Sequence, residues 1–220
     1  METLKLNKRE KGCFLFILSI IAFMFLIALL PMGHMPRSAQ SAALQQSRSI
    51  GLALFQYAQD HSGKYPEGKS STEVFQKLLD GAYISNPTLF YVPMHGKIEA
   101  DSNTKKLNPE NNCWDVTCCL DAQSPDGIPL VFLTGYKITY KAGTSAIPLT
   151  PLNANMTRSW SDWWHNVQYP VGGIAACYKN NSAEFVRAAT DGSVPNFIPA
   201  DFDPKGKTYR QLTPDGELPP

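Results

Sequence analysis

Residues 37–66, RSAQSAALQQSRSIGLALFQYAQDHSGKYP, contain the pattern that decides the fold. Small and apolar residues recur in this stretch every three or four positions, as on one face of an α-helix. They are Ala43, Ser47, Ile50, Leu54 and Tyr57, with Leu44, Gly51, Phe55 and Ala58 beside them. The opposite face carries polar residues: Gln45, Arg48, Gln56, Gln59 and Asp60. Ser62-Gly63 ends the pattern and Pro66 prevents its return. The stretch therefore predicts an amphipathic helix from about Arg37 to His61 that packs one face against the rest of the chain.

The segment before this helix, residues 13–32, is uncharged and apolar: CFLFILSIIAFMFLIALLPM. At about 1.5 Å per residue, a helix of this length spans about 30 Å, the thickness of the hydrocarbon core of a bilayer. Residues 1–12 contain four basic and two acidic side chains, which favours a cytoplasmic leader. We therefore expect a single-pass protein of the inner membrane, with its N-terminus in the cytoplasm and residues 33–220 in the periplasm. Pro31, Gly33 and Pro36 predict a kink, so that the membrane helix and the amphipathic helix form one long kinked helix.

A cleaved signal peptide is the alternative interpretation of the N-terminus. Its apolar core would be shorter than this one, and the nearest small-residue cleavage site, between Ala39 and Ala43, lies well past the apolar run. A lipoprotein anchor at Cys13 is excluded because that cysteine precedes the apolar run. Anchor and signal peptide place the following domain in the same compartment.

The rest of the chain predicts a small α+β domain. Ser70 and Glu73 form a capping-box pattern before a short helix at 72–79. Strand signals lie at 130–133, 136–140, 173–178, 184–190 and 194–198, with turns at Asn180-Asn181 and Asp191-Gly192. Residues 94–129 and 143–170 predict irregular connections, and the tail from about residue 199 is expected to be extended. The expected fold is α+β, with the long kinked N-terminal helix packed on a small antiparallel sheet.

Four cysteines lie in the expected periplasmic part: Cys113, Cys118, Cys119 and Cys177. Their even number and the oxidising compartment are compatible with one or two disulfides, and a bridge from Cys113 to Cys118 or Cys119 would close a small loop. Adjacent Cys118 and Cys119 are not expected to pair, because their side chains diverge. Free structural thiols remain open as an alternative, whereas a zinc site is disfavoured because no histidine lies at ligand spacing.

Residues 50–66, IGLALFQYAQDHSGKYP, resemble the end of the long helix in type II secretion pseudopilins, a branch of the type IV pilin family. They are most similar to the pseudopilin-like proteins of Verrucomicrobia and Planctomycetes. PDGIPLVF at 125–132 and DGSV at 191–194 resemble later features of that family. The resemblance implies a pilin-like fold and a role as a subunit of a secretion filament. It also implies a prepilin leader, for which cleavage between Gly12 and Cys13 is left open.

One position departs from the family pattern. The resemblance implies an acidic residue at the fifth position of the mature chain, where it is thought to pair with the N-terminal amine of a neighbouring subunit. Ile17 occupies that position here. The chain is therefore either a minor, tip-like subunit or a pilin-like protein that stays in the membrane.

The sequence offers little support for catalysis. It has no G-x-S-x-G, H-E-x-x-H or P-loop motif, so we expect no enzyme and no required cofactor. With 16 basic and 17 acidic residues after residue 12, it also lacks the charge of a nucleic-acid-binding protein. Loop aspartates could hold calcium, as in some major pseudopilins, although their spacing is not of the EF type: Asp191, Asp201 and Asp203.

An aromatic cluster provides an alternative function. It comprises Trp160, Trp163, Trp164 and Tyr169, and would be either a partner-binding patch or core packing under a long loop. The leading interpretation is a non-enzymatic, pseudopilin-like structural subunit whose partners are the bilayer and like subunits or secretion machinery. The alternative is a membrane-anchored periplasmic binding or interaction module that uses the aromatic patch.

Overall fold

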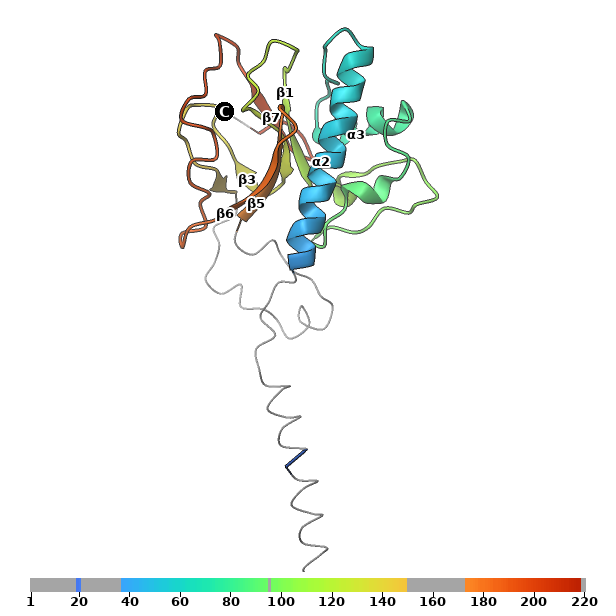
Figure 1. Ribbon diagram of the computed structural model, residues 1–220. Helices are drawn as coiled ribbons and strands as arrows, with labels where there is room; N and C mark the ends of the chain where they lie inside the picture. Colours follow the sequence, from blue (N-terminus) through green and yellow to red (C-terminus); the bar gives the residue numbers. More distant parts are fainter. Residues whose placement is uncertain (1–18, 21–36, 95, 150–172, 219–220) are drawn as a thin grey trace, which may run out of the picture. The chain divides into compact units, whose positions relative to one another are not determined.

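The helix expected between residues 37 and 61 is present as α2 (Arg37–Asp60) in the computed structural model of the chain (Figure 1). The structure describes residues 19–20, 37–94, 96–149 and 173–218. The chain divides into two compact units, Met1–Arg37 and Ser38–Pro220. Of the first unit only residues 19, 20 and 37 are described, and all three are helical. The expected membrane span at 13–32 and the kink after it thus lie almost entirely outside the described residues.

Across the described ranges, no helix combines the length and the hydropathy needed to cross a membrane.

The second unit is an α+β domain in which two α-helices accompany a small antiparallel sheet. Helix α3 (Ser71–Asp80) begins at the predicted cap, where the Ser70 hydroxyl accepts a hydrogen bond from the Glu73 amide at 3.2 Å. The Glu73 carboxylate in turn accepts a bond from the amide of Lys69 at 2.8 Å. These bonds satisfy backbone donors that a helix start leaves free, which is why the helix begins here.

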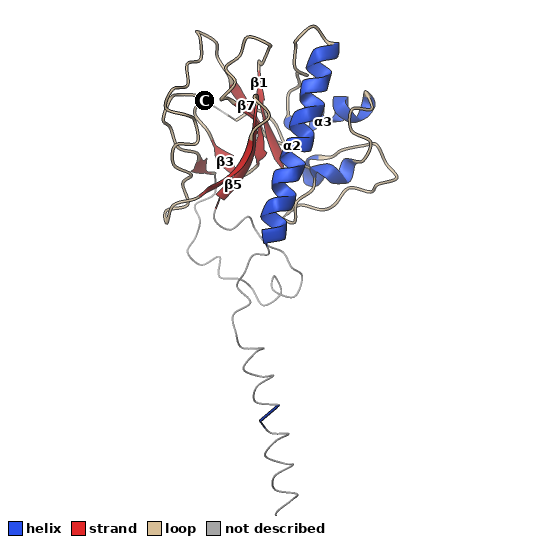
Figure 2. Cartoon of the chain, in the orientation of Figure 1, coloured by secondary structure: helices blue, strands red, loops and turns tan. Residues whose placement is uncertain are grey.

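The main sheet has five strands in the order β6-β5-β2-β1-β7, and every neighbouring pair is antiparallel. The strands are β1 (Trp114–Cys118), β2 (Pro129–Leu133), β5 (Gly173–Tyr178), β6 (Ala183–Arg187) and β7 (Arg210–Leu212). Figure 2 shows the helices on one side of this sheet and long loops on the other. The domain therefore has the two-layer construction in which a sheet buries one face against helices.

Short elements complete the domain. Strands β3 (Tyr136–Lys137) and β4 (Ile147–Pro148) form a separate two-stranded ladder. Two single turns of 3-10 helix, η1 (Pro87–Phe90) and η2 (Pro109–Asn111), lie in the connection between α3 and β1. Each begins with a proline, whose fixed φ and missing amide suit the first turn of a helix.

The core fills the space on both sides of the sheet. Phe75 of α3 stacks on Phe90 of η1, with ring centroids 4.8 Å apart. On the loop side, Phe132 of β2 meets Phe197 edge to face at 5.8 Å. Trp114 is fully buried at the start of β1. The three central strands are consequently buried along their whole length.

Five of the sequence predictions are corrected by this arrangement. Residues 94–129 were expected to be irregular, yet they contain β1, which lies between β2 and β7. Residues 143–170 were also expected to be irregular, yet they contain β4. Residues 136–140 form only the two-residue strand β3. Residues 194–198 form no strand and contribute one isolated bridge, between Val194 and Ala146. The tail from residue 199 was expected to be extended, and it supplies the edge strand β7. The strands expected at 130–133, 173–178 and 184–190 are confirmed in position, although the last ends at Arg187.

Candidate functional site

Helix α2 approaches the sheet closely because of a glycine. A Cβ added at Gly51 would lie 2.6 Å from Sγ of Cys177 on β5 and 3.9 Å from the side chain of Leu130 on β2. Only a residue without a side chain allows this contact without a shift of the strand. The neighbouring residues on this side of α2 are buried: Ala43, Ser47, Ile50, Ala53, Leu54 and Ala58. The predicted packing face of the helix is thereby confirmed, except for Phe55.

Polar and aromatic contacts fix the rest of α2 to the domain. The Gln46 side chain donates a hydrogen bond to the carbonyl of Tyr91 at 3.0 Å. Near the C-terminal end, the Tyr57 and His61 rings stack with centroids 3.8 Å apart. The Tyr83 hydroxyl donates to the Asp60 carboxylate at 2.8 Å, and this bond raises the pKa of Tyr83. The helix is thus held along its length and presents a defined outer face.

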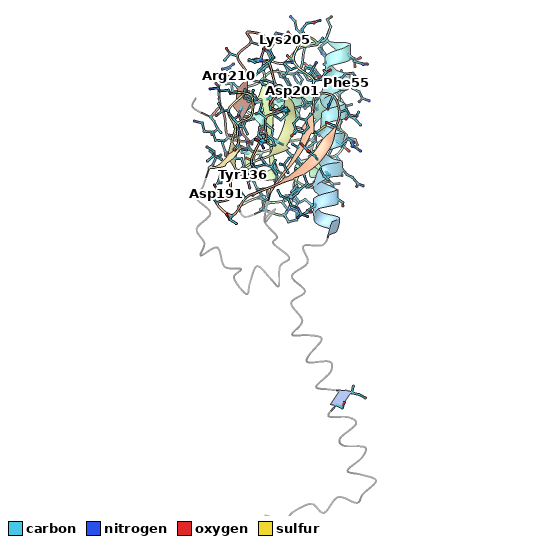
Figure 3. All side chains as sticks on the ribbon, turned by 60° about the vertical axis from the view of Figure 1, so that its left-hand side comes forward. Phe55, Tyr136, Asp191, Asp201, Lys205 and Arg210 are labelled. Atoms are coloured by element: carbon cyan, nitrogen blue, oxygen red, sulfur yellow. The ribbon has the colours of Figure 1, made fainter. Side chains whose placement is uncertain are left out.

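The outer face of α2 is apolar at its centre. Phe55, labelled in Figure 3, was expected beside the buried face, but 45% of its surface is exposed. Leu52, one helical turn earlier, is 42% exposed. Exposed polar residues extend this stripe along the helix: Ser41, Gln45, Arg48 and Gln59. Arg48 is the one charged residue in the stripe. We call this set, Ser41, Gln45, Arg48, Leu52, Phe55 and Gln59, the α2 stripe.

A nearly uncharged outer face is unusual for a helix on a domain surface. Such faces normally carry charged residues, which keep the helix solvated. Leu52 and Phe55 are three residues apart and so lie side by side on the helix. The α2 stripe therefore has the composition of a surface that packs against another helix.

The cysteines are arranged differently from the sequence prediction. Cys113 immediately precedes β1 and Cys118 ends it. With a rise of about 3.3 Å per strand residue, these residues lie about 16 Å apart, far beyond the Cα separation that a disulfide allows. The structure thus does not bring Cys113 within bridging distance of Cys118. All four cysteines of the described domain are free thiols, which is the alternative that the sequence left open. Cys118 and Cys119 were expected to diverge, yet their Sγ atoms are 3.3 Å apart.

The structure does not bring the candidate calcium ligands together. Asp191 accepts two hydrogen bonds from Ser193, from its amide at 2.9 Å and from its hydroxyl at 2.7 Å. These bonds lower the pKa of Asp191. Asp203 accepts a bond from the Lys205 amide at 2.9 Å, and Figure 3 shows Asp191 and Asp201 well apart. Among the described residues, no group of three or more metal-ligating side chains is assembled.

Two sets of predicted site residues cannot be placed in this geometry. Gly12 and Cys13, the candidate cleavage site, lie outside the described residues. The same holds for the whole aromatic patch: Trp160, Trp163, Trp164 and Tyr169.

A buried acid inside the sheet was not expected from the sequence. Asp115 of β1 is fully buried, and burial raises its pKa to about 7, against opposing contributions from the side chains of Thr134 and Gln211. The Gln211 amide donates to Oδ2 of Asp115 at 2.6 Å and to the carbonyl of Tyr136 at 2.6 Å. Oδ1 of Asp115 has no hydrogen-bond partner of ordinary geometry. This network ties β7 to the middle of the domain, and it has no opening to solvent that would make Asp115 a catalytic group.

A shallow groove of about 550 Å³ runs between α3 and residues 105–107. Glu73, Asp80, Lys105 and Lys106 line it with both signs of charge. This mixed, open surface has no arrangement of nucleophile and base.

Comparisons of the chain with protein-family models, with curated proteins and with solved structures found no match.

Proposed function

We propose that this chain is a non-enzymatic, pseudopilin-like structural subunit of a type II secretion or type IV pilus-type system. In this proposal the apolar segment 13–32 anchors the chain in the inner membrane, with residues 1–12 in the cytoplasm. The segment continues through a kink into α2, so that the two form one long helix. The domain that follows lies in the periplasm, and its partners are the bilayer, like subunits and the secretion machinery.

One observation carries the proposal: the inner face of α2 is buried against the domain, whereas its outer face is exposed and apolar at the centre. The inner face is seated on β5 and β2 at Gly51, while the outer face carries the exposed pair Leu52 and Phe55 in a nearly uncharged stripe. A helix that served only as a link to the domain would gain nothing from exposed apolar side chains. Burying the two side chains between subunits would contribute about 1.5–3 kcal/mol for each one that becomes fully buried.

Cleavage or retention of the leader, residues 1–12, distinguishes two versions of the proposal. If the chain enters a filament as a tip-like subunit, the leader of residues 1–12 is removed by cleavage after Gly12. The mature protein then begins at Cys13. If it stays in the membrane as a pilin-like protein, the N-terminus remains intact. Because Ile17 cannot form the ion pair of a filament subunit, both versions assign the subunit contacts to the rest of the helix. Mass spectrometry of the N-terminal peptide from purified membranes distinguishes them.

A charge placed in the α2 stripe tests the proposal. In Phe55→Glu, a carboxylate would have to be desolvated in the subunit interface. We therefore expect self-association of the full chain in mild detergent to weaken by about 30-fold or more. This change is equivalent to about 2 kcal/mol. The matched control is Ile98→Glu, which changes an apolar residue that is 58% exposed and lies in the connection between α3 and β1. Sedimentation over a range of protein concentrations measures both variants. Wild-type protein that stays monomeric at all concentrations, or equal loss in both variants, contradicts the proposal.

A further inference from the structure

The end of β1 brings two adjacent thiols together. Along a regular strand, successive side chains point to opposite faces of the sheet. Cys118 is the last residue of β1, and Cys119 has a φ of 66°, in the left-handed region. A residue with a side chain adopts this conformation at a cost of about 1–2 kcal/mol. The turn ends the alternation of the strand, and the two Sγ atoms lie 3.3 Å apart.

The two thiols differ in access and in surroundings. Cys118 is buried, with 6% of its surface exposed, whereas Cys119 is partly exposed. Nη2 of Arg210 lies 3.6 Å from Sγ of Cys119. The guanidinium is held there by Glu217, whose carboxylate accepts a bond from Nη1 at 2.6 Å. A fixed positive charge beside a sulfur stabilises the negative charge that develops during thiol exchange.

We propose that Cys118 and Cys119 form a redox-active dithiol that is oxidised to a vicinal disulfide by exchange with a disulfide compound. Cys119 gives up its proton and attacks one sulfur of the disulfide R–S–S–R, whose S–S bond breaks and releases one thiol. Cys118 then gives up its proton and attacks Sγ of Cys119, which breaks the mixed disulfide and releases the second thiol. The dithiol loses two electrons and two protons, and the disulfide compound gains both as two R–SH molecules.

The geometry assigns the order of the two attacks. Burial raises the pKa of Cys118 to about 12, which disfavours this thiol as the first nucleophile. Cys119 is the more exposed residue of the pair, so an external disulfide reaches it first. Closing the ring shortens the distance between the two Sγ atoms from 3.3 Å to about 2.05 Å. The Cα atoms of adjacent residues are about 3.8 Å apart, less than the usual separation in a disulfide, so the ring that forms is strained.

The other two thiols of the domain are protected from the same reaction. Cys113 is fully buried, its Sγ donates to the Val92 carbonyl at 3.2 Å, and burial raises its pKa to about 11. Cys177 is fully buried against Gly51, and burial likewise raises its pKa to about 11. Within the described domain, exchange is therefore expected to be confined to this pair of adjacent residues.

The reaction is tested on the full chain, purified in mild detergent and incubated with oxidised glutathione. Free thiols are then alkylated in denaturant, and cysteine-containing peptides are identified by mass spectrometry. We expect the peptide with Cys118 and Cys119 to lose alkylation at both residues and to be lighter than the dithiol by two hydrogen atoms, without attached glutathione. Cys113 and Cys177 keep their alkylation. A wild-type peptide that stays a dithiol, or that ends as a glutathione adduct, overturns the proposal.

Two single variants test the order of attack. In Cys118→Ala, Cys119 has no resolving thiol, and we expect it to accumulate one glutathione as a mixed disulfide. In Cys119→Ser, Cys118 is left buried, and we expect it to remain a thiol. Equal modification of both variants would overturn the assignment of Cys119 as the first nucleophile. Arg210 and Phe55 lie on different sides of the domain in Figure 3, so these variants leave the α2 stripe unchanged.

Discussion

Replacing Asp115 with asparagine should make the protein more stable at alkaline pH, although it removes a buried, hydrogen-bonded group. The asparagine side chain has the shape of the protonated aspartate, and its oxygen can accept the bond that Gln211 now donates to Oδ2. The variant therefore retains the network between β1 and β7. It removes only the ability to become charged inside the sheet.

The magnitude follows from the pKa of the buried carboxyl. An exposed aspartate has a pKa of 3.8, and burial raises the pKa of Asp115 to about 7. Between these values the folded protein binds a proton that the unfolded chain has lost. The free energy of unfolding therefore falls as pH rises from about 4 to about 7, and it changes no further above that range. At about 1.4 kcal/mol for each pKa unit, the fall amounts to about 4 kcal/mol.

Urea unfolding of the full chain in mild detergent, from about pH 4 to about pH 8, measures this effect. Wild type and Asp115→Asn should have similar stability near pH 4, and the variant should be more stable by up to about 4 kcal/mol near pH 8. Asp121→Asn is the control. Hydrogen bonding to Lys207 lowers the pKa of Asp121, so its contribution is lost only as pH falls below the range of the assay. A wild-type stability that is constant with pH, or an unchanged slope in Asp115→Asn, refutes the reasoning.

Three further substitutions test the packing. Gly51→Ala should destabilise the domain by about 1–3 kcal/mol despite the higher helix propensity of alanine, because the added methyl group meets Sγ of Cys177. Adding Cys177→Ala to this variant should restore part of the lost stability. An additive loss in the double variant would contradict this contact. Ser70→Ala should cost about 1 kcal/mol by removing the cap of α3, whereas Ser102→Ala, in an exposed turn, should cost nothing measurable. Phe132→Ala should cost about 3–5 kcal/mol in thermal unfolding, and a loss below about 1 kcal/mol would show that the core has been misassigned.

The elements that local signals specify were predictable from the sequence. The spacing of residues 43–58 defined α2, and the Ser70 cap defined the start of α3 to within one residue. Strands β2 and β5 were predictable because each combines a run of apolar, strand-forming residues with a turn signal nearby.

Strands β1 and β7 were missed for different reasons. The sequence of β1, WDVTC, alternates apolar and polar residues as a strand does, but this run has only five residues and lies in a long stretch rich in turn formers. Burial of its polar residues, Asp115 and Thr117, depends on strands and loops that are distant in the sequence. Strand β7 has three residues in a polar tail, and its pairing with β1 joins positions about ninety residues apart, such as Thr117 and Gln211. No local sequence pattern predicts the pairing of β7 with β1.

The candidate sites, too, were predictable only where a local sequence pattern specifies them. The periodicity of α2 identified its buried face but not the edge of that face, because the width of the sheet decides which flanking residue is covered. Phe55 falls just beyond it. Convergence of Cys118 and Cys119 depends on one left-handed residue after β1, and cysteine has no preference that predicts that conformation.

Photo-crosslinking from position 55 tests the central claim, that the α2 stripe is an interface between subunits. A photoreactive phenylalanine analogue replaces Phe55 in the full chain, expressed in its native membrane, and the same analogue at Ile98 is the control. We predict a crosslinked dimer from position 55 only, with the crosslinked peptide of the second subunit within residues 37–61. Crosslinks from position 55 to lipid alone, or dimers formed equally from both positions, would contradict the account.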